Sequence, residues 1–293
     1  MLPTFSPTDT EAVREMSLSE RKARAIKLMQ DNEPSEGYYL AFSGGKDSCA
    51  IKHLAKLSGV KFDAWYNQTT IDPPELVRFI KQNHADVTWS YPKNGNMMSR
   101  VAKKSALPPT RRVRWCCEEY KEYGGVGRTK IMGARKEESA ARDKRWHEVT
   151  QDHNKDKVVC PIVHWTSEQV WELLKNDGVK YCELYDEGWE RLGCVGCPLN
   201  NASRVREFER WPAFERNWKN AVTKNWENWK DKPKANGEPR AQSRFKTADE
   251  MWRWWMQEIE MDAFRGDCQS MNLWAINGQD APDLPPNNDS TTR

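Results

Sequence analysis

The chain has 293 residues, of which 38% are hydrophobic and 30% charged, and its 46 basic and 43 acidic residues leave a net charge of +3. A nearly balanced charge excludes a protein that is basic throughout, so any surface for nucleic acid must be local. Residues 1–15 contain no basic-then-apolar leader, and no run approaches the roughly 18 apolar residues of a membrane span. We therefore expect a cytoplasmic protein that does not contact membranes, with eight cysteines that are thiols or metal ligands rather than disulfides.

Short apolar runs and helical spacings alternate along the first part of the chain. The helical segment 74–83 has a proline in its first turn, where proline is favoured. Strand, helix, strand, helix, strand is the pattern of a parallel sheet covered on both faces. The predicted strands are residues 38–42, 61–66 and 87–91, and the predicted helices are residues 11–31, 48–57 and 74–83.

The second half of the chain adds fewer regular elements. Residues 130–134 and 158–162 could supply further strands, and Thr166 with Gln169 three positions later forms the start signal of a helix. Beyond Pro198 the composition changes to Trp, Lys, Arg and Glu, and no strand is indicated.

A glycine turn follows the first predicted strand and precedes its helix. Residues 43–48 read Ser-Gly-Gly-Lys-Asp-Ser. Two glycines let backbone N–H groups approach an anion closely, and the following helix contributes its positive N-terminal end. The segment is neither a Walker A loop nor a dinucleotide-binding loop, because the glycine spacing of both is absent. A plain strand-to-helix turn is the alternative, but the full set of six residues favours phosphate binding.

Residues 43–48 resemble the signature of the PP-loop ATP pyrophosphatase superfamily. Residues 67–75 resemble the turn after that family's second strand, although Thr70 stands where the family has glycine. Residues 133–142 and 161–188 resemble, in order, two segments of phosphoadenylyl-sulfate (PAPS) reductases. The chain is thus similar to the PAPS and adenylyl-sulfate reductase family. This resemblance implies a doubly wound parallel α/β sheet, of the adenine nucleotide alpha hydrolase type, with its ligand at the carboxyl ends of the strands.

The resemblance and the side-chain chemistry together give a set of candidate site residues. Guanidinium groups suit phosphate and sulfate, although exposed arginines paired to nearby glutamates are the alternative. Within the loop, Lys46 and Asp47 are also candidate catalytic residues, and Asp47 could orient Mg²⁺. The candidates for nucleotide binding are Ser43, Gly44, Gly45, Lys46, Asp47, Ser48, Thr69 and Arg135, and those for a substrate anion are Arg112, Arg114 and Arg142.

Two cysteine pairs predict a metal centre. Cys116 and Cys117 are adjacent, and Cys194 and Cys197 form a CxxC pair set among glycines. Four thiolates can hold a [4Fe–4S] cluster or Zn²⁺. Adjacent cysteines are unusual for zinc, and the arrangement resembles the cluster-binding set of adenylyl-sulfate reductases, which favours iron–sulfur. The remaining cysteines at positions 49, 160 and 182 lie in apolar or helical contexts, as small core residues do.

Cys268 lies where the reductases keep a nucleophilic cysteine. Their element is Glu-Cys-Gly-x-His, whereas this chain reads Asp-Cys-Gln-Ser-Met and has neither the glycine nor the histidine. Arg265 could lower the pKa of the thiol, but an incidental loop cysteine is the alternative. The departure puts the sulfate-reducing step in doubt.

The tryptophan-rich end has two possible interpretations. Apolar residues between Trp211 and Trp229 recur in steps of three and four, and a second helix is indicated from Trp252 to Phe264. Lysines and arginines interleaved with aromatics can bind single-stranded nucleic acid. The periodic spacing instead favours a helical hairpin that packs its tryptophans on the nucleotide domain.

Three functions remain open. A reductase would bind a nucleotide sulfate, attack it with a cysteine and need a thioredoxin-like reductant. An ATP pyrophosphatase would adenylate tRNA or DNA before sulfur insertion, and a nucleotide-binding accessory subunit would catalyse neither reaction. A homodimer is also left open. The expected parts are an N-terminal helix at 1–35, the nucleotide-binding domain with the cysteine pairs at 36–200, a helical Trp-rich extension at 201–276 and a disordered tail at 277–293.

Overall fold

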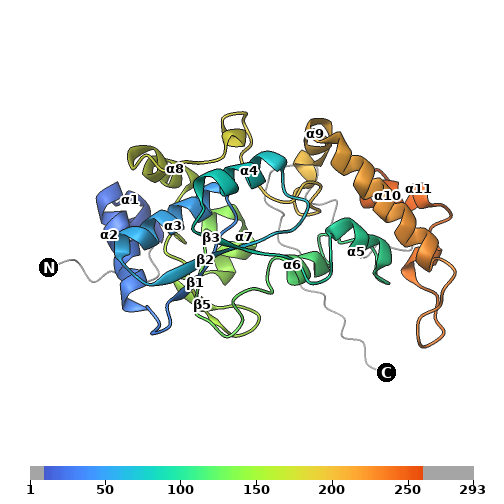
Figure 1. The fold of residues 1–293 in the computed structure, drawn as a ribbon, viewed down its shortest axis with the longest axis horizontal. Helices are drawn as coiled ribbons and strands as arrows, with labels where there is room; N and C mark the ends of the chain where they lie inside the picture. Colours follow the sequence, from blue (N-terminus) through green and yellow to red (C-terminus); the bar gives the residue numbers. More distant parts are fainter. Residues whose placement is uncertain (1–9, 260–293) are drawn as a thin grey trace, which may run out of the picture. The chain divides into compact units, whose positions relative to one another are not determined.

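The computed structural model describes residues 10–259 and divides the chain into two compact units (Figure 1). The first unit runs to Met97 and resumes over Trp115–Val195, while the second consists of Met98–Arg114 and the chain from Gly196 onward. The change of unit at Gly196 lies close to the expected boundary after residue 200. Residues 98–114 differ from expectation, because they belong to the helical unit. The expected tail at 277–293 lies outside the described residues.

The first unit contains a six-stranded sheet in the order β3-β2-β1-β4-β6-β5. Neighbouring strands are parallel except β5, which pairs antiparallel with β6. The predicted α/β class with a mostly parallel sheet is therefore confirmed, and β5 is a strand that the sequence analysis did not predict. The strands are β1 (Tyr38–Ala41), β2 (Phe62–Asn67), β3 (Val87–Ser90), β4 (Lys130–Ile131), β5 (Val149–Gln151) and β6 (Lys157–Val159).

The helices of the first unit begin and end at recognisable signals. Ser17 forms a capping box with Glu20 and so divides the predicted helix 11–31 into α1 and α2. Thr166 and Gln169 form the predicted capping box of α8. Helices α2, α3 and α8 pack against one another (Figure 1). The helices are α1 (Thr10–Glu15), α2 (Leu18–Asp31), α3 (Lys46–Ser58), α4 (Pro74–Asn83), α6 (Trp115–Tyr120), α7 (Ala140–Arg145) and α8 (Ser167–Asn176), with 3-10 turns at η1 (Lys136–Glu138) and η2 (Glu183–Tyr185).

The core of this unit lies between the sheet and its helices. Leu40 of β1 and Ile131 of β4 are fully buried, as are Ile51 and Leu54 on the inner face of α3. A parallel strand buried on both faces reads as a continuous apolar run, which is why residues 38–42 could be recognised as a strand.

The second unit is helical and its tryptophans face inward. Trp218 stacks on Trp255 with ring centroids 4.6 Å apart, and Trp252 packs beside Trp255 at 5.4 Å. The predicted helical hairpin is thus present within residues 10–259, whereas Phe264 lies outside them. Its helices are α9 (Asn201–Arg210), α10 (Pro212–Trp229) and α11 (Ala248–Trp255), with a 3-10 turn η3 (Ala241–Arg244); α5 (Met97–Lys103) begins at the point where the chain enters this unit.

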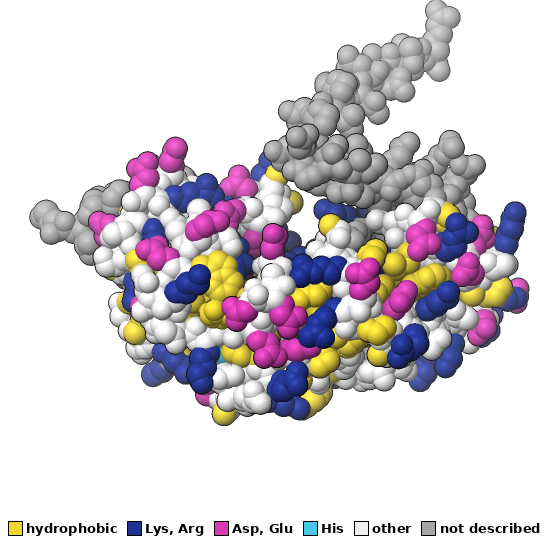
Figure 2. Space-filling view, turned by 90° about the horizontal axis from the view of Figure 1, so that it is seen from above, with side chains coloured by type: hydrophobic (Ala, Val, Ile, Leu, Met, Phe, Trp, Pro, Cys, Tyr) yellow, Lys and Arg dark blue, Asp and Glu magenta, His cyan; other side chains and the backbone are white. Residues whose placement is uncertain are grey.

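Two surface properties follow from the sequence. Figure 2 shows basic and acidic side chains interspersed over the face that it presents, in keeping with the net charge of +3. Within the described residues, no helix combines the length and apolarity needed to cross a membrane.

Candidate functional site

The sheet order fixes where a ligand can bind. Strand β1 pairs with β2 on one side and with β4 on the other, although β4 comes much later in the chain. The loops that leave the carboxyl ends of β1 and β4 therefore diverge at the same edge of the sheet. Such a switch point is where open α/β sheets bind their ligands. It brings residues 43–48, after β1, next to residues 133–135, after β4: a Cβ placed on Gly133 would lie 3.1 Å from the Asp47 carbonyl.

The loop after β1 is tightly built. Gly44 has φ +77°, and a Cβ at this position would lie 2.7 Å from Ile80 Cδ1 and 2.8 Å from Leu76 Cδ1. Ser48 Oγ donates to the Gly45 carbonyl at 2.8 Å, which ties the first turn of α3 to its N-cap. Only glycine fits this backbone next to α4, so the turn holds backbone N–H groups at the N-terminal end of α3.

Tyr185 lies at this loop and was not singled out from the sequence. The Lys46 N–H donates to Tyr185 Oη at 2.9 Å, and Lys46 Nζ lies 6.0 Å from the centroid of the Tyr185 ring. Burial raises the pKa of the Tyr185 hydroxyl well above its usual range, so it remains a neutral hydrogen-bonding group. Its position within a motif of the PAPS reductases was the only signal in the sequence.

Buried Arg135 and partly exposed Asp47 form an ion pair across the two loops. Arg135 Nε donates to Asp47 Oδ1 at 2.6 Å, and Arg135 Nη1 donates to the Glu137 carboxylate. Burial opposes the charge on Arg135, but Asp47, Glu137 and Glu138 outweigh it and raise the pKa of the guanidinium above its ordinary value. Lys46 Nζ lies 3.4 Å from Asp47 Oδ2, so one carboxylate contacts two cations.

The three other predicted arginines are divided between the units. Arg142 Nη1 donates to Glu138 Oε1 at 2.8 Å, and the Arg135 N–H donates to the same oxygen at 3.2 Å. Glu138 therefore joins Arg142 to the Asp47–Arg135 pair. Arg112 and Arg114 are exposed residues of the second unit.

Thr69 begins a second turn, after β2. Its N–H donates to Asp72 Oδ2 at 3.2 Å, and Tyr66 Oη donates to the same oxygen at 2.5 Å. Thr70 has φ +67°, in the left-handed region that favours glycine. The position at which the related family has glycine thus keeps a glycine-like backbone here.

The cysteines fall into two classes of exposure. Cys116, Cys117, Cys194 and Cys197 are half-buried, whereas Cys49, Cys160 and Cys182 are buried. The burial of the latter three confirms that they are core residues. Cys197 belongs to the second unit and the other three predicted ligands to the first. Over residues 10–259, no group of three or more His, Cys, Asp or Glu side chains is positioned to hold a metal ion. The four-cysteine centre stays a prediction, and Cys268 lies outside the described residues.

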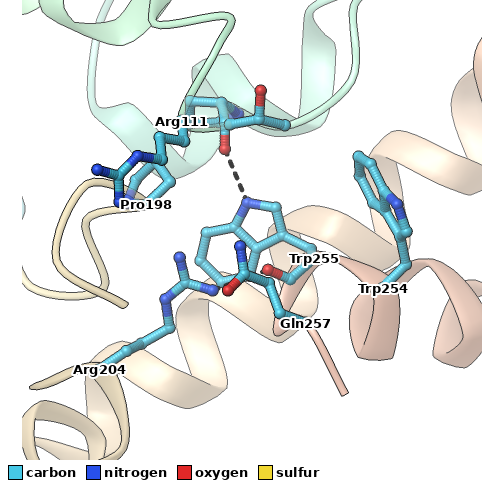
Figure 3. A pocket seen from close by; sticks show the side chains of 8 residues that line it. Arg111, Pro198, Arg204, Trp254, Trp255 and Gln257 are labelled. Atoms are coloured by element: carbon cyan, nitrogen blue, oxygen red, sulfur yellow. Dashed lines mark hydrogen bonds between the residues drawn. The ribbon is translucent and has the colours of Figure 1, made fainter. Parts of the chain in front are cut away.

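A small pocket lies within the second unit (Figure 3). Trp255 forms its base and donates its Nε1–H to the Pro109 carbonyl at 2.9 Å. Arg204 is buried, stacks on Trp255 with its Cζ 4.5 Å from the ring centroid and donates to the Trp255 carbonyl at 2.7 Å. Burial lowers the pKa of Arg204 to about 10. The pocket is lined by Pro109, Thr110, Arg111, Pro198, Arg204, Trp254, Trp255 and Gln257.

Comparison with known proteins extends the resemblance. The family model described as "phosphoadenosine phosphosulfate reductase domain" matches residues 37–200. An uncharacterised protein of Methanocaldococcus jannaschii is 29% identical over 216 residues, which cover 69% of this chain and 52% of that protein. The adenosine 5'-phosphosulfate reductase of Oceanobacillus iheyensis is 39% identical over 67 residues, 23% of this chain and 28% of the relative. The chain spans about half the length of the first of these relatives.

Among solved structures, the phosphoadenylyl-sulfate reductase of Candida auris in complex with phosphate is similar. It has 15% sequence identity and a TM-score of 0.47, and the match covers 67% of this chain and 98% of that one.

Proposed function

The chain belongs to the phosphoadenosine phosphosulfate reductase domain family, and from this premise we propose that it is an enzyme that binds an adenine nucleotide for sulfur chemistry. ATP, adenylyl sulfate and PAPS share an adenosine and a row of anionic groups. The observation that supports this proposal best is the turn at residues 43–48, at the switch point of the sheet, with Lys46 and the Asp47–Arg135 pair beside it.

Each part of this site has a physical role in the proposal. Backbone N–H groups of the turn and the N-terminal end of α3 attract the anionic groups of the nucleotide, and Lys46 adds a positive charge. Arg135 already donates through Nε to Asp47 and through Nη1 to Glu137. It therefore acts as a positioning residue that orients Asp47, the carboxylate that would hold Mg²⁺ if the nucleotide carries one. Ser43, Ser48 and Thr69 supply hydroxyls to the same edge.

Nucleotide binding tests the proposal directly. We expect ATP, adenylyl sulfate or PAPS to bind, and Lys46→Ala to weaken binding by about tenfold, the effect of losing one charge-assisted contact. Lys56→Ala is the matched control, because Lys56 lies on the same helix α3 but is paired with Asp86 at 2.8 Å. Calorimetry with each nucleotide measures both variants. Equal binding by the Lys46 and Lys56 variants, or no binding of any of the three nucleotides, would refute the proposal.

The chemistry that follows binding has two candidates. In the reductase candidate, a thiolate attacks the sulfur of the nucleotide sulfate and displaces the adenosine phosphate, which leaves an S-sulfonated cysteine. A thioredoxin-like dithiol then attacks the cysteine sulfur, releases sulfite and is itself oxidised to a disulfide. Burial raises the pKa of Cys49 and Cys160 to about 12 and that of Cys182 to about 11, so these thiols are protonated at neutral pH. The reductase candidate therefore depends on Cys268, outside the predicted cluster.

The same observation favours the second candidate, which needs no cysteine nucleophile. An ATP pyrophosphatase would transfer the adenylyl group of ATP to an oxygen of tRNA or DNA and release pyrophosphate. The carbon or phosphorus that bears this oxygen would then be activated for attack by sulfur, with AMP as the leaving group. Pyrophosphate release stimulated by nucleic acid supports this candidate. Sulfite formation that is abolished by Cys268→Ser supports the reductase. Nucleotide binding without either product leaves the accessory subunit.

We further propose that Cys116, Cys117, Cys194 and Cys197 hold a [4Fe–4S] cluster. Thiolates are the ligands of such clusters, and the half-buried state of all four contrasts with the other described cysteines. Protein purified without oxygen should be brown and contain about four irons per chain. Cys117→Ser should lose iron and visible absorbance, whereas Cys182→Ser should keep both. Colourless protein with stoichiometric zinc would contradict the assignment.

A further inference from the structure

Positive charge is concentrated in two segments that the structure assigns to the second unit. Residues 98–114 include six basic and no acidic residues, and residues 224–246 include seven basic and three acidic ones. The net charge of the whole chain is only +3, so the remainder of the chain is net negative. The chain is therefore nearly neutral as a whole, although these two segments are strongly basic.

Buried amides join the two segments. Asn225 is fully buried on α10, and its Nδ2 lies 2.7 Å from the Val101 carbonyl, 2.8 Å from that of Lys104 and 3.1 Å from that of Ala106. Asn228 Nδ2 donates to the Ala102 carbonyl at 3.1 Å. The end of α5 is thus fixed alongside the C-terminal half of α10, which brings the two basic segments next to each other. We call their basic residues at this junction the basic patch: Lys103, Lys104, Lys230, Lys232, Lys234 and Arg240.

Cations of the patch lie on tryptophan rings. Lys230 Nζ is 5.1 Å from the ring centroid of Trp226, and the ring of Trp229 has Lys232 Nζ at 5.1 Å and Arg240 Cζ at 4.8 Å. Cation–π contact holds such charges in place while their heads remain near the surface. Trp226 and Trp229 are partly exposed, but each ring already carries a cation, which competes with a base for the same ring face.

Arg240 of the patch and the Trp229 ring on which it lies each have a donor that needs an acceptor. Trp229 Nε1 and Arg240 Nε are buried and have no hydrogen-bond partner within residues 10–259. Buried N–H groups are nearly always paired, and an anionic oxygen is a suitable acceptor for both. Asp231 and Glu238 offset Lys230 and Lys234, which leaves Lys232 and Arg240, on Trp229, as the centre of the patch.

We propose that the basic patch binds the phosphodiester backbone of a nucleic acid, through phosphate contacts and without base stacking. Cations held on tryptophan rings suit a regular row of phosphates, and because these rings carry cations, they are poor apolar anchors for a lipid surface. The inference deepens the second candidate function and rests on it for the role of the polymer as substrate. Binding is measured without nucleotide, so it can fail or succeed independently of adenylation.

The test uses the full chain and three labelled probes: a short DNA duplex, the single strand of the same sequence and an RNA hairpin. We expect affinity to fall steeply with salt, with a slope of log K against log salt of about −4 to −5 if four to six phosphates are engaged. Lys232→Ala with Arg240→Ala should lower the slope by about two and the affinity about tenfold or more. The probe that binds most tightly distinguishes DNA from RNA as the source of the phosphates.

Two further variants serve as controls for this binding experiment. Lys175→Ala in the first unit is the matched control, since Lys175 is exposed and its Nζ lies 6.0 Å from the Trp171 ring; it should leave binding unchanged. Lys232→Glu changes one exposed side chain and should weaken binding even if the double variant folds poorly. The proposal would be overturned if the patch and control variants bound equally well. It would also be overturned if the protein preferred the single strand with little salt dependence, or bound phosphatidylserine vesicles as well as nucleic acid.

Discussion

Asp47 contacts two cations that come from different loops of the first unit. Lys46 is its neighbour in sequence, whereas Arg135 lies after β4 and reaches Asp47 only because β1 and β4 are adjacent. The charge of the buried guanidinium is therefore neutralised by a residue of the proposed nucleotide loop. Stability and ligand binding are linked at this pair.

A double-mutant cycle on Asp47→Asn and Arg135→Lys measures this link. Each single change breaks a short ion pair with a buried partner, so we expect a coupling free energy of about 1–3 kcal/mol between the two sites. Urea unfolding of the four proteins provides the measurement. Additive effects would show that the two side chains act independently.

His84 gives the first unit a pH-dependent stability. Burial, with nearby Lys52, lowers the pKa of His84 to about 4 from its usual 6.5. The unfolded chain then takes up the proton more readily than the folded one. Stability is fully present above about pH 6.5 and is lost as the pH falls towards 4, by up to about 3 kcal/mol. Unfolding at pH 7.5 and 5 measures the loss, and His84→Gln should reduce it; an unchanged pH dependence in that variant would assign the effect elsewhere.

Among the elements, the turn between β1 and α3 is the most constrained. Gly44→Ala would force a Cβ into a left-handed backbone and against Ile80 and Leu76 of α4. We expect a loss of about 2–4 kcal/mol, from backbone strain and overpacking together. Gly59→Ala is the matched control: φ there is +73°, but nothing lies within 4 Å of the new Cβ, so only the strain of about 1–2 kcal/mol applies. Thermal unfolding compares the two, and equal losses would show that contact with α4 is unimportant.

Local signals explain which elements the sequence predicted. Pro74 and the pair Thr166–Gln169 mark the starts of α4 and α8 through their own backbone chemistry, so these helices could be placed closely. β5 spans only Val149–Gln151, which is too short for a sequence pattern to predict, and it is defined by its pairing with β6. The family motifs placed Asp47 and Arg135 among the site residues, but their pairing was not predicted. Tyr185 could not be assigned to Lys46, because nothing local connects residues 139 positions apart.

At the scale of the whole molecule, the chain leaves the first unit at Met97 and returns at Trp115. This excursion could not be predicted from the sequence, because its cause is a long-range contact: Asn225 donates to three carbonyls of residues 101–106. Neither the composition nor the residue spacing of 98–114 indicates that this segment packs against Asn225.

Asn225→Leu tests how far the second unit depends on this contact. One buried and two partly buried carbonyls lose their donor, so we expect a loss of about 3 kcal/mol in the free energy of unfolding. Asn228→Ala removes a more exposed bond to Ala102 and should cost about 1 kcal/mol. Tryptophan fluorescence and ligand-free calorimetry both follow unfolding of the chain, because tryptophans lie in both units. Similar losses in the two variants would contradict the role of Asn225.

The excursion also orders events during synthesis. During translation, residues 98–114 leave the ribosome more than a hundred residues before Asn225 does. The cationic segment therefore lacks its packing partners at a stage when the sheet of the first unit can already form. Until α10 arrives, those six positive charges are tethered to a folded body as an open loop. A nascent chain of this protein therefore presents its most basic segment to the polyanionic surroundings of the ribosome before that segment acquires its final shape.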